Sequence, residues 1–376
     1  MQGTANSSRR WLTMTLAIAA ALPVFAQDAP APQYSETMPL AATQGLVLDM
    51  TEAASRAIAV GERGTILVSE SRADWRQIER VPTRATLTAV SASGDVVWAV
   101  GHDGTILASR DGGLSWELQR VDVMRPASDD APFDPRQGVP LLDVLAIDAE
   151  HAFAIGAYSQ LLRTDDGGKS WHFVPTSAHA EADELDAGVD EMDDGEDENW
   201  SFSDEDLALD EESEPHFNAI ARTGSGALFI AGERGAAFRS RDGGESWERL
   251  ELPYAGSMFG ALGYAGDHVV VFGMRGNAFE SRDLGDTWTQ IDTGTELSLM
   301  GGTPIGAGGF ALVGVNGVVL VRANASTEVK ARTYANAAQE TPVLSGVLAR
   351  PDGSLLLAGE KGVDRFDPSS NNKAGK

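Results

Sequence analysis

Aspartates at a fixed spacing are the first residues in this sequence whose chemistry needs an explanation. The pattern S/T-x-D-x-G-x-S/T-W occurs four times, with its aspartate and tryptophan at Asp111 and Trp116, Asp166 and Trp171, Asp242 and Trp247, and Asp283 and Trp288. A carboxylate can act as a catalytic acid or nucleophile, but here it stands in a polar turn, where it can accept backbone hydrogen bonds. The glycine permits a left-handed backbone, and the tryptophan supplies apolar area. This pattern, an Asp box, therefore predicts a structural role for the aspartates.

A second candidate set is cationic. Gly-x-x-Gly segments recur along the chain, and their third position is basic in four of them, at Arg63, Arg234, Arg275 and Lys361. A guanidinium group in an exposed turn can form bidentate hydrogen bonds to a partner's carboxylates. These four residues are our candidate binding contacts, and the alternative is that an exposed turn simply tolerates Arg and Lys.

Several function classes lack support in the sequence. The six histidines show no metal-ligand spacing, and neither a G-x-S-x-G elbow nor a phosphate-binding loop occurs. Cysteine is absent, which removes disulfides and thiolate chemistry. The formal charge of −27 argues against nucleic acid as a partner, because phosphate binding needs a concentrated basic surface. We therefore expect no enzyme activity, no cofactor and no metal site.

The repeat that carries these turns predicts the fold. Each copy contains an apolar strand, a Gly-x-x-Gly turn, a second apolar strand and a polar turn, although the third copy has Ser159 in place of the second glycine. The first glycine falls at Gly61, Gly101, Gly156, Gly232, Gly273, Gly314 and Gly359. A period near 41 residues with four short strands is typical of a propeller blade. The sequence therefore predicts an all-β, seven-bladed β-propeller with Asp-box repeats, in which blades one to seven follow these glycines.

One blade can be divided into strands directly. In blade two we expect strands at 87–92, 96–100, 105–109 and 115–120, and we expect both glycines of the Gly-x-x-Gly turn to serve positive φ angles. In such an antiparallel meander, the Gly-x-x-Gly turns and the connections between blades lie at one end, here called the mouth. The Asp boxes lie at the opposite end. The four basic residues should therefore surround the mouth.

The last blade ends near Phe366 without a recognisable fourth strand. A ring of blades must close without an open edge. We expect residues 34–40, which precede the first inner strand, to supply the missing outer strand of blade seven.

The N-terminus has the features of a signal peptide at 1–26. Arg9 and Arg10 precede an apolar run, Leu12 to Val24, that is too short to span a bilayer, and a small residue, Ala26, follows. We expect a flexible leader at 27–33, the propeller at 34–368 and a disordered tail at 369–376. The mature protein would then be periplasmic without membrane insertion, whereas an uncleaved anchor is the alternative. The export route stays open.

Two insertions enlarge the mouth. The larger, about 176–215, holds 18 Asp or Glu residues between Glu181 and Glu214 and should be disordered. Apolar residues punctuate the acids, so the insertion could be a docking segment, and a solvated spacer is the alternative. The smaller insertion, about 124–140, is rich in proline and should form an extended loop.

The Asp-box copies resemble the bacterial neuraminidase repeat propellers. Within that superfamily, the cadence AVGHDGTILASRDGGLSW beginning at Ala99, the seven blades and the signal peptide are similar to the photosystem II stability/assembly factor family. The resemblance implies a non-enzymatic scaffold or assembly factor that binds a membrane protein complex, either photosystem-like or exporter-like. That family is known for an arginine-rich surface, which cannot be aligned residue by residue with this chain.

Two alternatives come from other function classes. A propeller with this mouth could be a carbohydrate- or peptide-binding module. A sialidase-like glycosidase is the weaker alternative, because it requires an arginine triad and a Tyr nucleophile assisted by Glu. Only Arg80-Val81-Pro82 faintly resembles the Phe-Arg-Ile-Pro motif of sialidases, and no Glu is convincingly paired with Tyr158 or Tyr254 in the sequence.

Overall fold

The computed structural model describes residues 33–38, 44–122, 137–176 and 214–370. All of them belong to one compact unit, Gln33–Lys376. Every described sheet is an antiparallel meander, and three short 3-10 helices, η1 (Glu62–Gly64), η2 (Met274–Gly276) and η3 (Val315–Gly317), form Gly-x-x-Gly turns.

The strands of the first four blades run in chain order from the inside of the ring to the outside. Blade one holds β1 (Val47–Ala53), β2 (Arg56–Gly61), β3 (Ile66–Ser69) and β4 (Arg76–Gln77). Blade two holds β5 (Leu87–Ser93), β6 (Val96–Gly101), β7 (Ile106–Ser109) and β8 (Glu117–Arg120). Blade three holds β9 (Leu141–Ala146), β10 (Ala152–Gly156), β11 (Leu161–Thr164) and β12 (His172–Phe173). Blade four holds β13 (Phe217–Arg222), β14 (Leu228–Gly232), β15 (Ala236–Ser240) and β16 (Glu248–Glu251).

The remaining blades follow the same order. Blade five holds β17 (Met258–Gly263), β18 (Val269–Gly273), β19 (Ala278–Ser281) and β20 (Thr289–Gln290). Blade six holds β21 (Leu299–Ile305), β22 (Gly309–Gly314), β23 (Val318–Arg322) and β24 (Lys330–Thr333). Blade seven has three described strands, β25 (Leu344–Ala349), β26 (Leu355–Gly359) and β27 (Gly362–Phe366).

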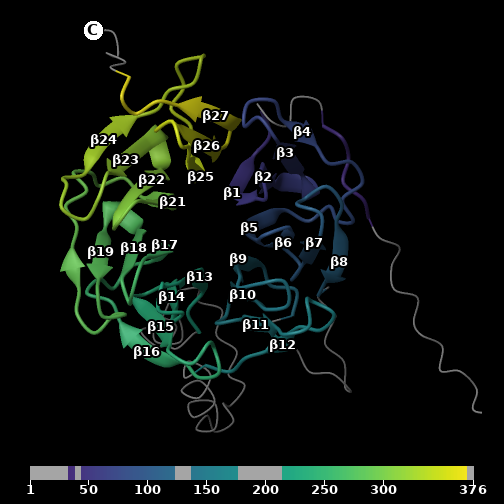
Figure 1. Ribbon diagram of the computed structural model, residues 1–376, viewed down its shortest axis with the longest axis horizontal. Coiled ribbons are helices and arrows are strands. Elements are labelled where there is room, and N and C mark those ends of the chain that lie inside the picture. The colour runs from purple at the N-terminus through teal and green to yellow at the C-terminus, as the bar shows by residue number, and fades with distance from the viewer. Residues whose placement is uncertain (1–32, 39–43, 123–136, 177–213, 371–376) are drawn as a thin grey trace, which may run out of the picture. The chain divides into compact units, whose positions relative to one another are not determined.

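The seven sheets form a closed ring (Figure 1). Each inner strand packs against the inner strand of the next blade, and β25 of blade seven packs against β1 of blade one. The prediction of an all-β, seven-bladed propeller is therefore confirmed. The strands predicted for blade two are also confirmed to within two residues at each end, as β5 to β8.

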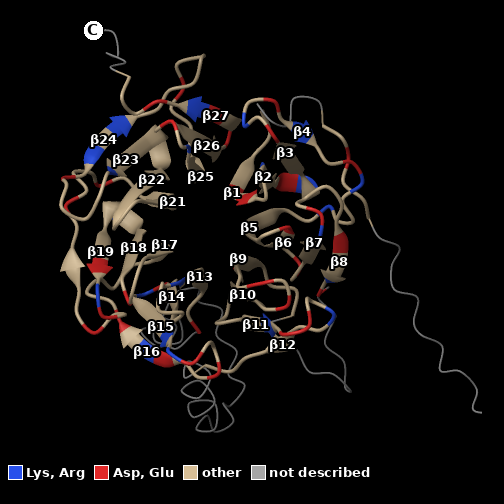
Figure 2. Ribbon diagram, in the orientation of Figure 1, with Lys and Arg blue, Asp and Glu red and all other residues tan. Residues whose placement is uncertain are grey.

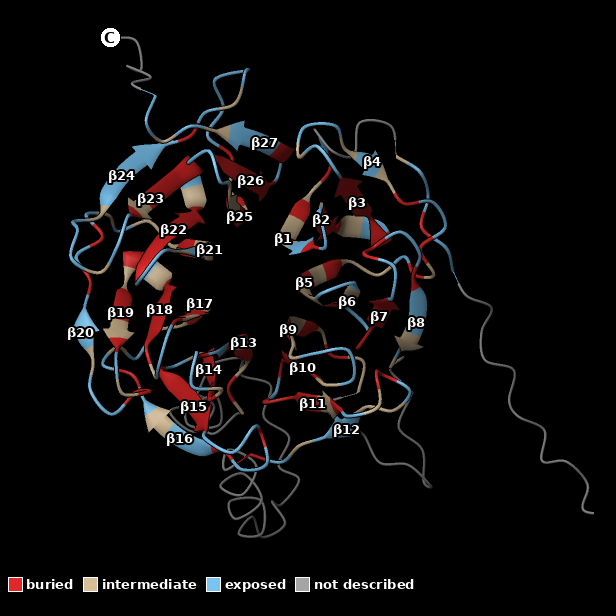
Figure 3. Cartoon of the chain, in the orientation of Figure 1, coloured by how far each residue is buried: buried red, intermediate tan, exposed pale blue. Residues whose placement is uncertain are grey.

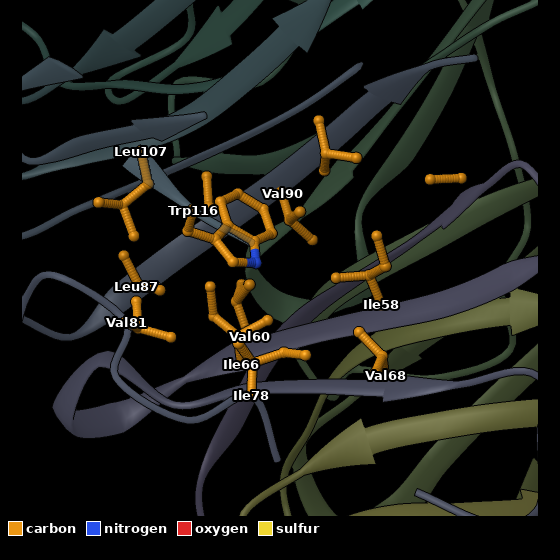
Figure 4. Packing of buried hydrophobic residues seen from close by; sticks show 13 residues of the cluster. Ile58, Val60, Ile66, Val68, Ile78, Val81, Leu87, Val90, Leu107 and Trp116 are labelled. Carbon is orange, nitrogen blue, oxygen red and sulfur yellow. The ribbon is translucent and has the colours of Figure 1, made fainter. Parts of the chain in front are cut away.

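Packing between blades explains the apolar repeat. The second strand of each blade is covered on both faces by its neighbours, so it has a continuous apolar run instead of alternation. The cluster between blades one and two contains Ile58 and Val60 of β2, Leu107 of β7 and the ring of Trp116 (Figure 4). Burying each such side chain contributes about 1.5–3 kcal/mol. Burial falls toward the outer strands, where β8, β12, β16, β20 and β24 are largely exposed (Figure 3).

The first glycine of each turn has a different role from the one expected. Gly61 has φ −171° and Gly314 has φ −172°, which is extended backbone that any residue adopts. The restriction is steric. A Cβ on these glycines would stand 2.0 to 2.5 Å from the carbonyl oxygen of the residue that precedes the inner strand, at Leu46, Thr86, Pro140, His216, Ser257, Ser298 and Val343. Only the second glycine, such as Gly64 with φ 69°, serves a positive φ as predicted.

The same carbonyl is held by a hydrogen bond in every blade. In blade two, His102 N–H donates to the Thr86 carbonyl at 3.0 Å, and Gly101 N–H closes the turn onto the Thr105 carbonyl at 3.1 Å. The hydrogen bond to this carbonyl ties the turn to the connection that enters its blade.

We expect Gly101→Ala to lower the free energy of unfolding by about 3 kcal/mol or more, because its Cβ would overlap the Thr86 carbonyl oxygen, a backbone atom, at 2.1 Å. Gly94→Ala is the matched control, since a Cβ there meets no atom within 4 Å and pays only the left-handed backbone cost at φ 63° of about 1–2 kcal/mol. Urea unfolding of both variants measures the difference. Equal losses would show that close approach is not the constraint at Gly101.

The expected closure of blade seven is wrong for the described residues. Residues 33–38 form no strand, and they bind the outer part of blade one. Ser35 N–H donates to the Val81 carbonyl at 2.8 Å, Met38 N–H donates to Gln77 Oε1 at 2.8 Å, and Gln77 Nε2 donates back to the Glu36 carbonyl at 2.8 Å. These reciprocal bonds hold the segment on the wrong blade for the predicted pairing. Residues 39 and 40 lie outside the described residues.

Blades seven and one are joined instead through their inner strands. Val47 and Met50 of β1 pack with Leu356 and Ala358 of β26. The Ser345 hydroxyl of β25 donates to the Val47 carbonyl at 2.7 Å. Apolar burial and this side-chain bond therefore close the ring between the described strands.

Several predicted segments lie outside the described residues. They are the signal peptide, the leader up to residue 32, most of both insertions (123–136 and 177–213) and the tail from residue 371. Among the residues that are described, no helix combines the length and apolarity needed to cross a membrane.

Candidate protein-binding face

The turns of the mouth present their third residue in an unusual conformation. Arg63 has φ 54° and ψ 34°, and Arg275 has φ 54° and ψ 33°. Six blades place a non-glycine residue in this left-handed region, namely Arg63, Asp103, Tyr158, Arg234, Arg275 and Asn316. Asn and Asp tolerate this conformation comparatively well, whereas Arg and Tyr have no such preference. Backbone geometry therefore does not explain why Arg occupies three of these turns.

The four candidate contacts lie at the mouth in two neighbouring pairs. Lys361 and Arg63 belong to the adjacent blades seven and one, whereas Arg234 and Arg275 belong to the adjacent blades four and five. All four side chains are exposed. Lys361 differs from the others, because its Nζ lies 3.4 Å from Glu340 Oε2. Of the described residues, none forms an ion pair with the side chain of Arg63 or Arg275, so both guanidinium groups remain available to a partner.

Aromatic residues belong to the same side of the mouth as Arg234 and Arg275. Tyr158, at the third position of the turn in blade three, keeps 39% of its surface exposed. Its ring meets the His216 ring edge-on at a centroid distance of 5.1 Å, and His216 Nδ1 lies 3.7 Å from Glu233 Oε2. The sequence singled out the equivalent basic residues but gave Tyr158 no binding role. Its position in the repeat is the signal that could have found it.

The turn of blade three also holds the segment that leads into β13. Ser159 donates to the Pro215 carbonyl through both its N–H, at 3.0 Å, and its hydroxyl, at 2.9 Å.

Blades three to five thus contribute one sector of the mouth, here called the Arg–Tyr sector and defined by Tyr158, His216, Arg234 and Arg275. Tyr and Arg are the residues most enriched where proteins bind one another.

Tyr158 is one of the two tyrosines that the sequence offers as a glycosidase nucleophile. In the described structure the hydroxyl of Tyr158 has no hydrogen bond to a Glu carboxylate, which a tyrosine nucleophile requires. Glu233 instead faces His216.

The box aspartates lie at the opposite end and are saturated by their own turns. Asp283 Oδ2 accepts from the Thr287 hydroxyl at 2.6 Å, and Oδ1 accepts from the Ser281 hydroxyl at 2.7 Å and Thr287 N–H at 2.9 Å. These donors lower the pKa of Asp283 to about 2. Such carboxylates are ionised acceptors and have no proton to give in catalysis at neutral pH.

The boxes also tie neighbouring blades together. Arg110 donates to the Gly167 carbonyl of the next box at 2.7 Å, and Arg56 donates to the Asp111 carbonyl at 3.3 Å. Blade six lacks the box, and Arg322 takes its place by donating to the Asn324 and Ala325 carbonyls of its own turn and to Glu280 of blade five.

Asp283→Asn should lower the urea midpoint at pH 7, because an amide cannot accept on both sides of the turn. The folded pKa of Asp283 lies below its unfolded value, so its contribution is present above pH 4 and is lost as the pH falls toward 2. We therefore expect the variant and wild type to converge in stability between pH 4 and pH 2. A deficit that stays constant over this range would contradict a role for the ionised carboxylate.

No model of a known protein family matches this chain. Two curated relatives match parts of it. The photosystem II assembly lipoprotein Ycf48 of Synechococcus sp. (strain CC9605) is 37% identical over 70 residues, which cover 19% of this chain and 17% of the relative. The photosystem II assembly protein Ycf48 of Synechococcus sp. (strain JA-2-3B'a(2-13)) is 26% identical over 133 residues, with 26% of this chain and 39% of the relative covered. The matches thus span less than half the length of these relatives.

This chain is similar to the Ycf48 proteins. Two solved structures of Ycf48 match it over nearly its whole length and share its fold. The structure described as YCF48 bound to D1 peptide has a TM-score of 0.58 and 16% identity, and covers 90% of this chain and 96% of its own. YCF48 from Cyanidioschyzon merolae has a TM-score of 0.60 and 14% identity, and covers 90% of this chain and 100% of its own.

Proposed function

We propose that this protein is a non-enzymatic, periplasmic scaffold or assembly factor that binds a membrane protein complex through its mouth. The observation that carries the proposal is the Arg–Tyr sector, in which exposed Tyr158, Arg234 and Arg275 occupy left-handed backbone positions that favour Gly or Asn. Local sequence similarity to photosystem II assembly proteins supports the same function class.

The sector favours a partner segment that carries carboxylates. Arg234 and Arg275 project from adjacent blades, so one extended segment can meet both. A bidentate Arg–carboxylate pair adds geometric specificity to charge attraction. Tyr158 adds a rigid amphipathic surface at low entropic cost. One Ycf48 structure holds a D1 peptide, which shows that a related propeller accepts a peptide.

The proposed location depends on the N-terminal sequence. A basic start, a short apolar run and a small residue at Ala26 favour export and cleavage. The mature propeller would then meet the periplasmic parts of a membrane complex.

Crosslinking in cells, followed by purification of the tagged protein from membranes and mass spectrometry, tests this function. We expect one membrane complex to be captured by the wild type and its recovery to fall at least about tenfold in the Arg63→Glu/Arg234→Glu/Arg275→Glu variant, because three favourable charges become repulsive.

Lys169→Glu is the matched control, since Lys169 is an exposed residue of the Asp-box turn in blade three, at the end opposite the mouth. Both variants should keep the wild-type melting temperature, which separates a binding defect from misfolding. Undiminished capture by the triple variant would place the binding site elsewhere. If the wild type captures no specific complex, the scaffold function itself is wrong.

A further inference from the structure

The inner strands share a position that faces the centre of the ring. In each blade the first residues of the inner strand form a bulge, and the residue beyond it pairs with the residue before the first glycine, as Asp49 does with Val60. The seven residues at this position line a central cavity of about 240 Å³, and they are Asp49, Ala89, Asp143, Ala219, Gly260, Gly301 and Gly346. Five blades therefore place Ala or Gly where blades one and three place Asp.

Each of these two carboxyls joins two blades. Asp49 Oδ1 accepts from the N–H of Met50 in its own strand at 2.8 Å, and Oδ2 accepts from the N–H of Val90 in blade two at 2.8 Å. Asp143 repeats the arrangement two blades away, where Oδ1 accepts from Val144 N–H at 2.7 Å and Oδ2 from Ile220 N–H of blade four at 2.8 Å. The bonds span the seams between blades one and two and between blades three and four.

The cavity offers these carboxyls no counter-charge. Its lining contains no Lys, Arg or His and no other Asp or Glu. Figure 2 shows that charged residues gather on the outer strands and loops, while the inner strands are mostly uncharged. The other charged residues on the strands packed around the two aspartates are Glu52 and Arg56 of blade one, which pair with Arg72 and Glu70, and the exposed Arg222 at the end of β13.

Two partly enclosed carboxyls without a cation resist ionisation. Burial raises the pKa of Asp49 to about 7, against the opposing effect of its two N–H donors. Burial likewise raises the pKa of Asp143 to about 7, and repulsion from the Asp49 charge adds to the effect.

We propose that Asp49 and Asp143 make the stability of the closed ring depend on pH. A central cavity that holds two carboxyls and no cation is most stable when those carboxyls are protonated. The sign follows from linkage. The folded ring binds protons that the unfolded chain releases above pH 4, so stability is greatest near pH 4 with respect to these groups and falls as the pH rises through 7. The equilibrium constant for unfolding should rise by up to about tenfold per pH unit for each carboxyl in this window.

Urea unfolding between pH 4.5 and 8.5 tests the proposal with Asp49→Ala/Asp143→Ala, which installs the residue that blades two and four already carry. We expect the unfolding constant of the wild type to climb with pH relative to that of the double variant. The two proteins share every other titratable group, so the contributions of those groups cancel in this comparison. Glu150→Gln, a change at an exposed carboxyl in the loop between β9 and β10, should keep the wild-type profile.

The single variants keep the test decisive if the double variant does not fold, because each should retain part of the pH dependence. A ¹³C NMR titration of the aspartate carboxyls in the wild type provides a direct second readout. Two resonances that titrate near pH 7 and are lost one at a time in the single variants would support the proposal. It is overturned if every aspartate titrates below pH 5, or if the wild type and the folded variants share the same pH profile.

Discussion

The contact on which the mouth depends is the approach of a backbone carbonyl to the first glycine of each Gly-x-x-Gly turn. In blade one the Leu46 carbonyl accepts from Glu62 N–H at 3.1 Å, and a Cβ on Gly61 would stand 2.0 Å from the same oxygen. The contact recurs in all seven blades, so every turn is fixed relative to the connection that enters its blade.

This constraint divides the turn into fixed and variable positions. The glycines are dictated by sterics and by positive φ, whereas the third residue only has to occupy a left-handed conformation. Arg63, Tyr158 and Arg275 occupy it despite the poor fit of large side chains to that region. A rigid scaffold that presents variable turn residues is the usual way in which a repeat fold acquires a binding surface. The fold therefore explains where the variable side chains of the turns are presented, and in the proposed function these side chains would select the partner.

The sequence was sufficient to predict the ring of blades, but it was insufficient to predict contacts that form only between blades. Blade number and the strands of blade two could be predicted because each repeat carries its own apolar strands and turn signals. The closure by residues 34–40 could not, since a short segment of mixed polarity does not reveal which sheet edge it follows. The bonds of Ser35 and Met38 to blade one depend on tertiary proximity.

The sequence did not predict a role for Asp49 and Asp143, for a related reason. Within its own strand each residue looks like an ordinary polar position. Only the ring brings two such positions, far apart in the sequence, to the wall of one cavity. The first glycine shows the same limit, because its role depends on a carbonyl from a neighbouring connection and not on its own φ.

Aspartate therefore plays opposite electrostatic roles at two kinds of position in the ring. Asp283 lies in an exposed turn that supplies two hydroxyl donors and an N–H, so its carboxylate is held ionised. Asp49 receives only two N–H donors and lines the same partly enclosed cavity as a second carboxyl, so its proton is held more tightly. The outer boxes favour folding when the pH is above 4, and the central cavity favours it when the pH is below 7. Because these windows overlap, the two sets of aspartates together favour a folded ring in mildly acidic solution, where the boxes are charged and the central cavity is not.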